Sequence, residues 1–251
     1  MFFILFGSLL FICSSSRAEV DLSAAGVSTE LPSSVVTPFI KTIGLGADHR
    51  PYEPATPLGI IPGVNFGIEA TIAKVAPTEG DTGGVLGALP ILPVARLHVH
   101  KGITGFLDVG LSAIYYKGYK GVGPIRVYGG DVKLALYQPE EGLTAAARLC
   151  YTSSKIWIIS TQTITPQFVF SRQMSFADPY FGFGYQYATG KVDLPLSVLG
   201  QSLSITGKGK AQGAIAFTGV QFKGLGLMFT IEGTYSTVGV HTLGTKFGLA
   251  F

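Results

Sequence analysis

Two histidines lie two residues apart in this sequence and are its strongest candidates for metal chemistry. His98 and His100 fall in the run ARLHVH, whose polar–apolar alternation predicts a β-strand with both imidazoles on one face. Imidazole nitrogens are common zinc ligands, and this spacing would let two of them share an ion. No third cysteine, histidine or acid stands at a motif spacing. We therefore expect a structural pair hydrogen-bonded to carboxylates, and predict no metal and no cofactor.

Residues for catalysis or phosphate binding form no recognisable motif. Ser236 and His241 could meet across a hairpin, as a hydrolase would need, while the acids that a protease would pair with a histidine are scattered: Glu79, Asp81 and Asp193. The glycine-rich run at 83–88 does not lie in a strand–loop–helix setting, so it is no dinucleotide or phosphate loop. We predict no catalytic residues and no enzyme.

The composition indicates a membrane protein that crosses with strands. Only 13% of the 251 residues are charged, yet no run of about 18 apolar residues follows the first dozen. A spanning chain without apolar helices must satisfy its backbone within a closed barrel; a soluble β-sandwich is the alternative. Residues 1–18 predict a secretory signal peptide. The formal charge of +3, one unit lower once Arg17 is cleaved, favours no nucleic-acid partner.

The last eleven residues alternate between apolar and small or polar side chains and end on Phe251. Such a strand has the length of a tilted transmembrane β-strand. Similar alternation predicts an antiparallel barrel of ten strands over 59–251, with eight or twelve left open, at 60–75, 91–101, 104–116, 125–138, 142–154, 156–171, 176–190, 205–222, 225–238 and 241–251.

The connections between these strands alternate in length. Short turns are expected near residues 101, 140, 173 and 224, and longer loops at 76–90, 117–124 and 191–204. Short periplasmic turns and longer external loops are typical of outer-membrane barrels. This arrangement predicts that both termini lie in the periplasm.

The two faces of each strand have different compositions. Apolar positions such as Leu134, Phe183 and Phe247 are expected to face lipid, and the opposite parity to face the lumen. The candidate lumen residues are Glu69, Arg96, His98, His100, Asp108, Asp131, Lys133, Arg148, Glu232 and Lys246. Buried charges need partners, so we expect three pairs: Arg96 with Asp108, Asp131 with Arg148, and Glu232 with Lys246.

Residues 19–58 do not have a barrel pattern. A short helix is expected at 33–43, with Pro38 limiting its length, followed by the proline-rich stretch ADHRPYEPATPLG at 47–59. Two interpretations stay open for this region: a disordered periplasmic leader, or a segment tucked into the lower mouth of the barrel.

Over residues 59–251 the chain resembles the porin-like outer-membrane β-barrel proteins of Gram-negative bacteria, on the strength of its terminal strand and loop pattern. The resemblance implies contact with outer-membrane lipid, insertion by the barrel-assembly machinery, and a role for Phe251 in the assembly signal. It carries over no site residue. We expect a narrow pore for small polar solutes, the solute being unknown; the alternative is a structural or partner-binding barrel with a packed lumen.

Overall fold

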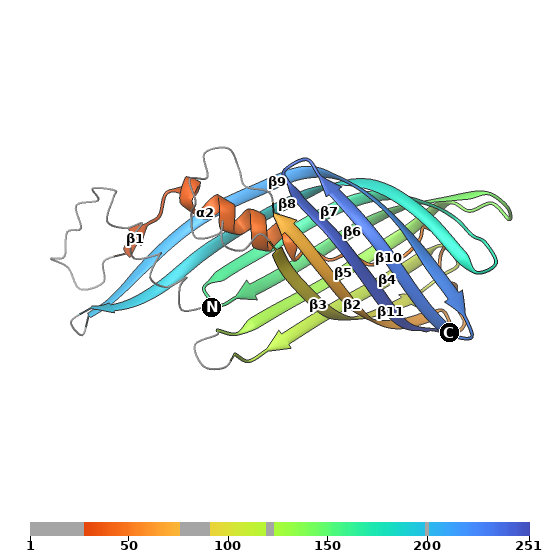
Figure 1. Ribbon diagram of the computed structural model, residues 1–251, viewed down its shortest axis with the longest axis horizontal. Coiled ribbons are helices and arrows are strands. Elements are labelled where there is room, and N and C mark those ends of the chain that lie inside the picture. The colour runs from red at the N-terminus through yellow and green to blue at the C-terminus, as the bar shows by residue number, and fades with distance from the viewer. Residues whose placement is uncertain (1–27, 76–90, 119–122, 199–200) are drawn as a thin grey trace.

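The protein is a closed antiparallel β-barrel, shown in Figure 1. The computed structural model describes residues 28–75, 91–118, 123–198 and 201–251. Within these residues ten strands form the wall, and β9 pairs with β8 and β11 with β2 to close it. The strands are β2 Val64–Val75, β3 Ile91–Gly102, β4 Leu107–Tyr116, β5 Ile125–Tyr137, β6 Leu143–Ile156, β7 Ile159–Arg172, β8 Ala177–Val198, β9 Gln201–Gly224, β10 Leu227–Ser236 and β11 Val240–Ala250.

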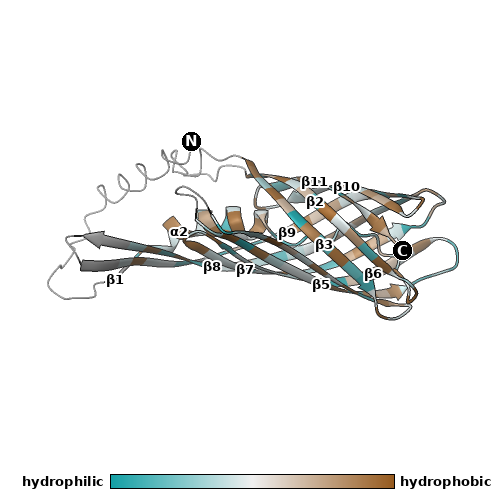
Figure 2. Cartoon of the chain, turned by 90° about the horizontal axis from the view of Figure 1, so that it is seen from below, coloured by the Kyte–Doolittle hydropathy of each residue, from teal (hydrophilic) through white to brown (hydrophobic). Residues whose placement is uncertain are grey.

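The predicted strand count and face assignment are confirmed. Alternate residues along each strand are buried and exposed, because successive side chains of a strand point to opposite faces. All eight positions that the alternation places toward lipid are exposed: Val132, Leu134, Leu136, Phe181, Phe183, Leu227, Phe229 and Phe247. Apolar and polar bands alternate along the barrel strands in Figure 2. The outer wall is therefore an apolar belt suited to lipid.

One predicted loop is wrong. Residues 191–204 were expected to connect two strands, but β8 and β9 continue through most of this region and form a hairpin much longer than the others. Pairs such as Lys191 with Lys208 carry polar side chains where lipid-facing strands carry apolar ones. A strand that leaves the lipid loses the apolar alternation that reveals it in a sequence. The predicted signal peptide, and the loop at 76–90 with Glu79 and Asp81, lie outside the described residues.

The chain enters the barrel from the end where this long hairpin lies. Strand β1 (Ser28–Glu30) pairs in parallel with β9 at Ser204–Thr206. Helix α2 (Ser33–Ile40) and the π-helical turn η1 (Lys41–Leu45) follow and pack against β7, β8 and β9. Pro38 lies inside α2. Because proline lacks an N–H and crowds the preceding turn of a helix, it explains why α2 ends and the wider π-helical turn η1 follows.

The two ends of the described chain lie at opposite ends of the barrel. Phe251 exchanges backbone hydrogen bonds with Val64 (N···O 2.9 and 3.1 Å), close to the turn after Gly102, whereas β1 lies beside the β8–β9 hairpin (Figure 1). The predicted position of residues 19–58 on the side of the carboxyl terminus is wrong for residues 28–40, which lie toward the β8–β9 hairpin, whereas Leu58 does reach the end where Asp108 lies. The chain instead crosses the whole lumen before β2 begins.

No helix in the described part of the chain is both long enough and apolar enough to cross a membrane.

Candidate functional site: a lumen filled by the N-terminal segment

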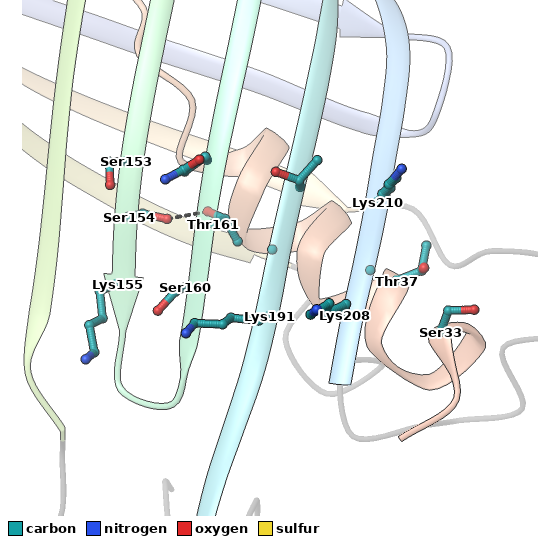
Figure 3. A pocket seen from close by; sticks show the side chains of 14 residues that line it. Ser33, Thr37, Ser153, Ser154, Lys155, Ser160, Thr161, Lys191, Lys208 and Lys210 are labelled. Atoms are coloured by element: carbon teal, nitrogen blue, oxygen red, sulfur yellow. Dashed lines mark hydrogen bonds between the residues drawn. The ribbon is translucent and has the colours of Figure 1, made fainter. Parts of the chain in front are cut away.

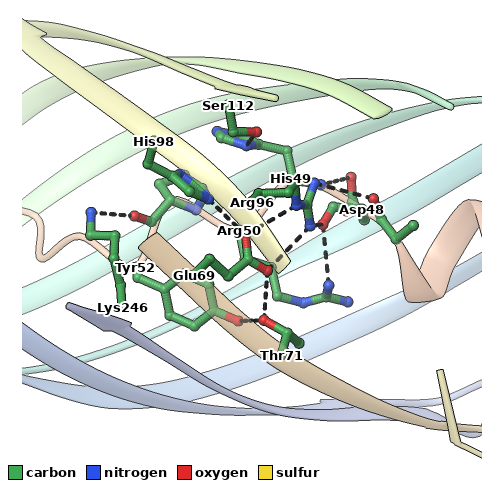
Figure 4. Close-up of polar contacts among 12 residues, drawn as sticks. Asp48, His49, Arg50, Tyr52, Glu69, Thr71, Arg96, His98, Ser112 and Lys246 are labelled. Carbon is green, nitrogen blue, oxygen red and sulfur yellow. Dashed lines mark hydrogen bonds and ion pairs between the residues drawn. The ribbon is translucent and has the colours of Figure 1, made fainter. Parts of the chain in front are cut away.

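The lumen is occupied by residues 45–58, which we call the plug segment. All side chains from Thr42 to Ala55 are buried, and the segment ends where the amide of Leu58 donates to the Asp108 carboxylate (3.1 Å). Figure 4 shows its side chains among those of the strands. Within this region, residues 28–58 form an ordered segment, which runs through the lumen and reaches its lower end at Leu58.

Asp48 is the most heavily bonded plug residue. Its carboxylate accepts hydrogen bonds from Thr152 (2.9 Å), Thr165 (2.6 Å) and Gln186 (2.8 Å), which lie on β6, β7 and β8. The amide of His49 donates to the same carboxylate (2.8 Å). A buried carboxylate is tolerated when such donors replace its water shell. One plug side chain thus ties three strands together.

On the opposite wall, Glu69 collects a second network. Its carboxylate lies 3.0 Å from Nε of Arg96 and 2.6 Å from Nε2 of His98, and accepts from the Thr71 hydroxyl (2.5 Å). Arg96 also donates to the carbonyl of Asp48 (2.5 Å), while the hydroxyl of Tyr52 bonds to Thr71. This wall network is therefore joined to the plug twice (Figure 4).

Glu53 and Lys246 form a buried ion pair between the plug and β11. Lys246 also donates to the carbonyl of Pro51 (2.8 Å), and Asn65 donates its amide to Glu53 (2.8 Å). Glycine at position 244 makes room for this part of the plug, because a Cβ there would collide with the Tyr52 hydroxyl. Both charges of the pair therefore have additional partners, as buried pairs need.

Two more wall cations bind the plug backbone. Lys133 forms an ion pair with Asp108 (2.9 Å) and donates to the carbonyls of Pro54 and Thr56 (both 3.0 Å). Arg148 donates to the carbonyl of Glu53 (2.6 Å). The plug backbone forms no regular structure here, so these contacts satisfy carbonyls that water would otherwise solvate.

All ten residues assigned to the lumen from sequence are buried inside the barrel. The three ion pairs expected among them are wrong. Arg96 lies opposite Glu69, and Asp108 opposite Lys133, in the strand register. Asp131 contacts His49 and His100, while Glu232 accepts from the Tyr180 hydroxyl (2.8 Å). Sequence alone gave neither the register nor the charges that the plug contributes.

Sequence reasoning missed the plug residues themselves: Asp48, His49, Arg50, Tyr52 and Glu53. The available signal was the density of charged and aromatic residues in DHRPYEP, at residues 48–54. A solvated linker shows the same composition, so the pattern indicates polarity and not burial.

Little space is left around the plug. The interior cavity lined by Asp48, Arg50, Arg148 and Glu232 has a volume of about 10 Å³, enough for at most one water molecule. A solute path through this part of the lumen would require the plug to move.

The catalytic candidates that the structure describes, Ser236, His241 and Asp193, do not form a triad. Nδ1 of His241 lies 3.3 Å from the backbone nitrogen of Ser236 and accepts from it, and the imidazole stacks on Tyr235. The hydroxyl of Ser236 accepts from the amide of Val238 (3.4 Å). Asp193 accepts from Ser204 within the β8–β9 hairpin (3.1 Å).

A pocket of about 800 Å³ lies beside α2, and Figure 3 shows the side chains that line it. Hydroxyl groups from β6 and β7, two residues of α2 and four lysines line it: Lys155, Lys191, Lys208 and Lys210. No acidic residue is among its lining residues. The pocket therefore carries a concentrated positive charge that favours anions.

Comparison with known proteins finds only distant structural likenesses. No family model and no curated protein matches the sequence. Among solved structures, the outer-membrane protease OmpT of Escherichia coli is 9% identical (TM-score 0.41; 74% of this chain and 93% of that chain covered). The N-terminal β-barrel domain of Pseudomonas aeruginosa OprF is 11% identical, with a TM-score of 0.31 over 74% of this chain and 97% of that chain. Acinetobacter baumannii Omp33 is 8% identical, with a TM-score of 0.33 over 75% of this chain and 97% of that chain.

At these identities and TM-scores the likenesses carry no argument about this chain. The structure itself has a closed antiparallel wall with an apolar outer belt, which is the architecture of outer-membrane β-barrels and agrees with a location in the outer membrane.

Proposed function

We propose that this outer-membrane barrel is closed by its own plug segment and acts as a binding platform rather than as an open pore. The observation that carries the proposal is the filled lumen: Asp48 and Glu53 are buried and bonded to the wall, and Arg50 is buried and bonded to carbonyls of the N-terminal segment itself. An open pore needs water along its axis, whereas these charges are satisfied by protein groups. Single-channel recordings of the intact chain are expected to give no conductance steps.

The lysine-lined pocket is the surface that we propose for binding. Lys155 and Lys191 lie four residues beyond the exposed aromatic residues Tyr151 and Tyr187 on the same strand faces. Four residues of a strand tilted by about 40° rise about 10 Å. Interfacial aromatics mark the edge of the hydrocarbon, so these lysines lie at the height of lipid headgroups.

The ligand that fits this position is a phosphate-bearing lipid headgroup. Lysine ammonium groups bind phosphates as point charges, and the outward direction of the side chains presents them to neighbouring lipid. In this proposal the long-loop end is external, so the phosphates belong to the outer leaflet. The side chains of Ser153, Ser160 and Gln162 add hydrogen-bonding groups to the same pocket.

The test measures lipid A binding to the refolded barrel in detergent by native mass spectrometry. We expect retention by the wild type, and loss of it when all four pocket lysines are changed to glutamine. Lys74→Gln is the matched control, because Lys74 is an exposed lysine on β2, outside the pocket. Inorganic phosphate as a competitor separates a free-anion site from a headgroup site. Equal lipid retention by the quadruple variant and the wild type contradicts the proposal.

A further inference from the structure

Three buried histidines meet where the plug crosses β3. His49 belongs to the plug, and His98 and His100 to the strand; their ring centroids are 5.3, 5.8 and 6.4 Å apart. One ring nitrogen from each lies within 4.8 Å of those of the other two. The third histidine that the sequence lacked near His98 is therefore supplied by a segment about fifty residues away, inside the lumen.

The hydrogen bonds of His98 and His100 leave one lone pair free on each ring. Nε2 of His98 lies 2.6 Å from the Glu69 carboxylate, which only accepts, so the proton is on Nε2 and the lone pair on Nδ1. Nδ1 of His100 lies 3.2 Å from Oδ1 of Asn65, an acceptor oxygen, so His100 carries its lone pair on Nε2. The amide of Asn65 is oriented by its donation to Glu53.

These two lone-pair nitrogens, Nδ1 of His98 and Nε2 of His100, are the buried histidine nitrogens that form no hydrogen bond in the described part of the chain. Buried polar atoms are nearly always satisfied, so each exception needs an explanation. In each histidine, the other ring nitrogen is held by the Glu69 carboxylate or the Asn65 amide, which fixes the direction of the ring. Such outer partners are typical of metal-binding histidines, where they fix the tautomer and the ring direction.

His49 and Asp131 complete the arrangement. Nε2 of His49 lies 2.8 Å from Oδ1 of Asp131, which also lies 3.3 Å from Nε2 of His100. Nδ1 of His49 lies 2.7 Å from the Ser112 hydroxyl. The carboxylate only accepts, so without a metal the proton of His49 is on Nε2, and Nδ1 accepts from the Ser112 hydroxyl. Zinc takes Nε2 in the other tautomer, in which the proton lies on Nδ1 and the Ser112 hydroxyl accepts from it. The carboxylate supplies a fourth ligand and one negative charge.

The wall is shaped around these groups. A Cβ at Gly110 would collide with the Asp131 carboxylate and with the His100 ring, and one at Gly129 would lie 2.7 Å from Nδ1 of His49. Glycine at these two positions of β4 and β5 therefore leaves the room that the imidazoles and the carboxylate occupy.

We propose that His49, His98, His100 and Asp131 form a zinc site that fastens the plug segment to the barrel wall. Three imidazoles and one carboxylate suit Zn²⁺, which prefers four nitrogen, sulfur or oxygen ligands in a tetrahedron. Zinc–nitrogen bonds of about 2.0–2.1 Å hold ligand nitrogens about 3.4 Å apart. The 4.8 Å limit on the nitrogen separations means that ring shifts of about 1 Å close the site.

The site joins two parts of the chain, and this gives the ion a structural role. Because one ligand comes from the plug and two come from β3, zinc binds the plugged form better than a form with the plug withdrawn. Binding to one state only stabilises that state. Zinc is therefore expected to enter as the plug docks during refolding and to slow withdrawal of the plug afterwards.

The test refolds the full chain in detergent with equimolar Zn²⁺, removes loose metal with a weak chelator, and measures retained zinc by elemental analysis. Refolding with Co²⁺ gives an independent spectroscopic readout of a tetrahedral nitrogen–oxygen site. We expect about one ion per chain in the wild type and in His241→Gln, which changes the remaining histidine outside the cluster. His49→Gln and His100→Gln are expected to lose the ion.

Ser112→Ala provides a variant that keeps every ligand. It removes the partner of His49 Nδ1 and is expected to weaken zinc binding about 10-fold or more, the usual effect of removing an outer partner. A wild-type barrel that retains no zinc and gives no tetrahedral Co²⁺ spectrum overturns the proposal. So does equal retention by wild type, His49→Gln and His100→Gln. If the glutamine variants do not fold, the wild-type spectrum and Ser112→Ala decide; neither readout depends on lipid binding or conductance.

Discussion

Lys246 near the end of the chain forms its buried ion pair with Glu53, 193 residues earlier in the plug segment. The pair joins β11 to the segment that fills the lumen, and both side chains are almost wholly buried. We therefore expect Lys246→Met to cost about 3–5 kcal/mol of unfolding free energy, because it leaves the Glu53 carboxylate without its cation. Urea unfolding in detergent micelles measures this difference.

Two controls separate the ion pair from a general loss of packing. The double variant Glu53→Gln/Lys246→Met is expected to be more stable than Lys246→Met alone, because no unpaired charge is left. Lys223→Met breaks a pair with Asp178 in which the lysine is 39% exposed, so its cost is expected to be smaller, about 1 kcal/mol or less. Equal costs for Lys246→Met and Lys223→Met would show that the plug pair has no special weight.

Asp48 should hold the plug against the wall. Asp48→Asn puts an amide group where the Thr165 and Gln186 donors point, so at least one of these donors loses its acceptor. An unsatisfied buried donor costs about 1–3 kcal/mol. We expect faster proteolysis of residues 28–58 from the folded barrel, monitored by mass spectrometry, while β2–β11 stay intact. Wild-type cleavage kinetics in this variant would contradict the role assigned to Asp48.

The lipid-facing belt predicts a cost that depends on depth. Phe183 lies in the middle of the apolar part of β8 and is exposed on the outer face. Phe183→Arg is expected to cost about 2–4 kcal/mol in a refolding titration with lipid vesicles. Phe176→Arg, at an exposed phenylalanine before β8 begins, is expected to cost about 1 kcal/mol or less. Similar costs at both positions would refute the assignment of the belt.

The sequence predicted the wall far better than its contents. Alternation placed Phe183 and Phe247 outside and Arg96 and Lys246 inside, because a strand with different surroundings on its two faces must alternate. Residues 45–58 have no regular periodicity, so nothing local distinguishes a buried plug from a solvated linker. Two of the expected pairs among wall charges failed for the same reason: Glu53 and His49 come from that segment and take Lys246 and Asp131 as partners. The third, Arg96 with Asp108, failed because the strand register puts Glu69 opposite Arg96 and Lys133 opposite Asp108.

Phe251 tests a different part of the account, assembly. Its backbone pairs with Val64 where β11 meets β2, while its side chain is exposed. Phe251→Ala keeps the backbone bonds but removes the terminal aromatic ring. We predict reduced yield in the outer membrane, with nearly unchanged stability of the barrel that does assemble. Normal outer-membrane yield of this variant, measured by fractionation, would show that the ring is no part of the assembly signal.

The central claim is that the plug segment closes the lumen, and planar-bilayer recordings test it most directly. The intact chain is compared with a variant that lacks residues 28–58, each first shown by protease protection to be inserted in the bilayer vesicles. We predict no conductance steps from the intact chain and stable steps from the deletion variant, whose wall charges then line water. Steady steps of similar size from both proteins would contradict a closed lumen and show that the barrel is an open pore.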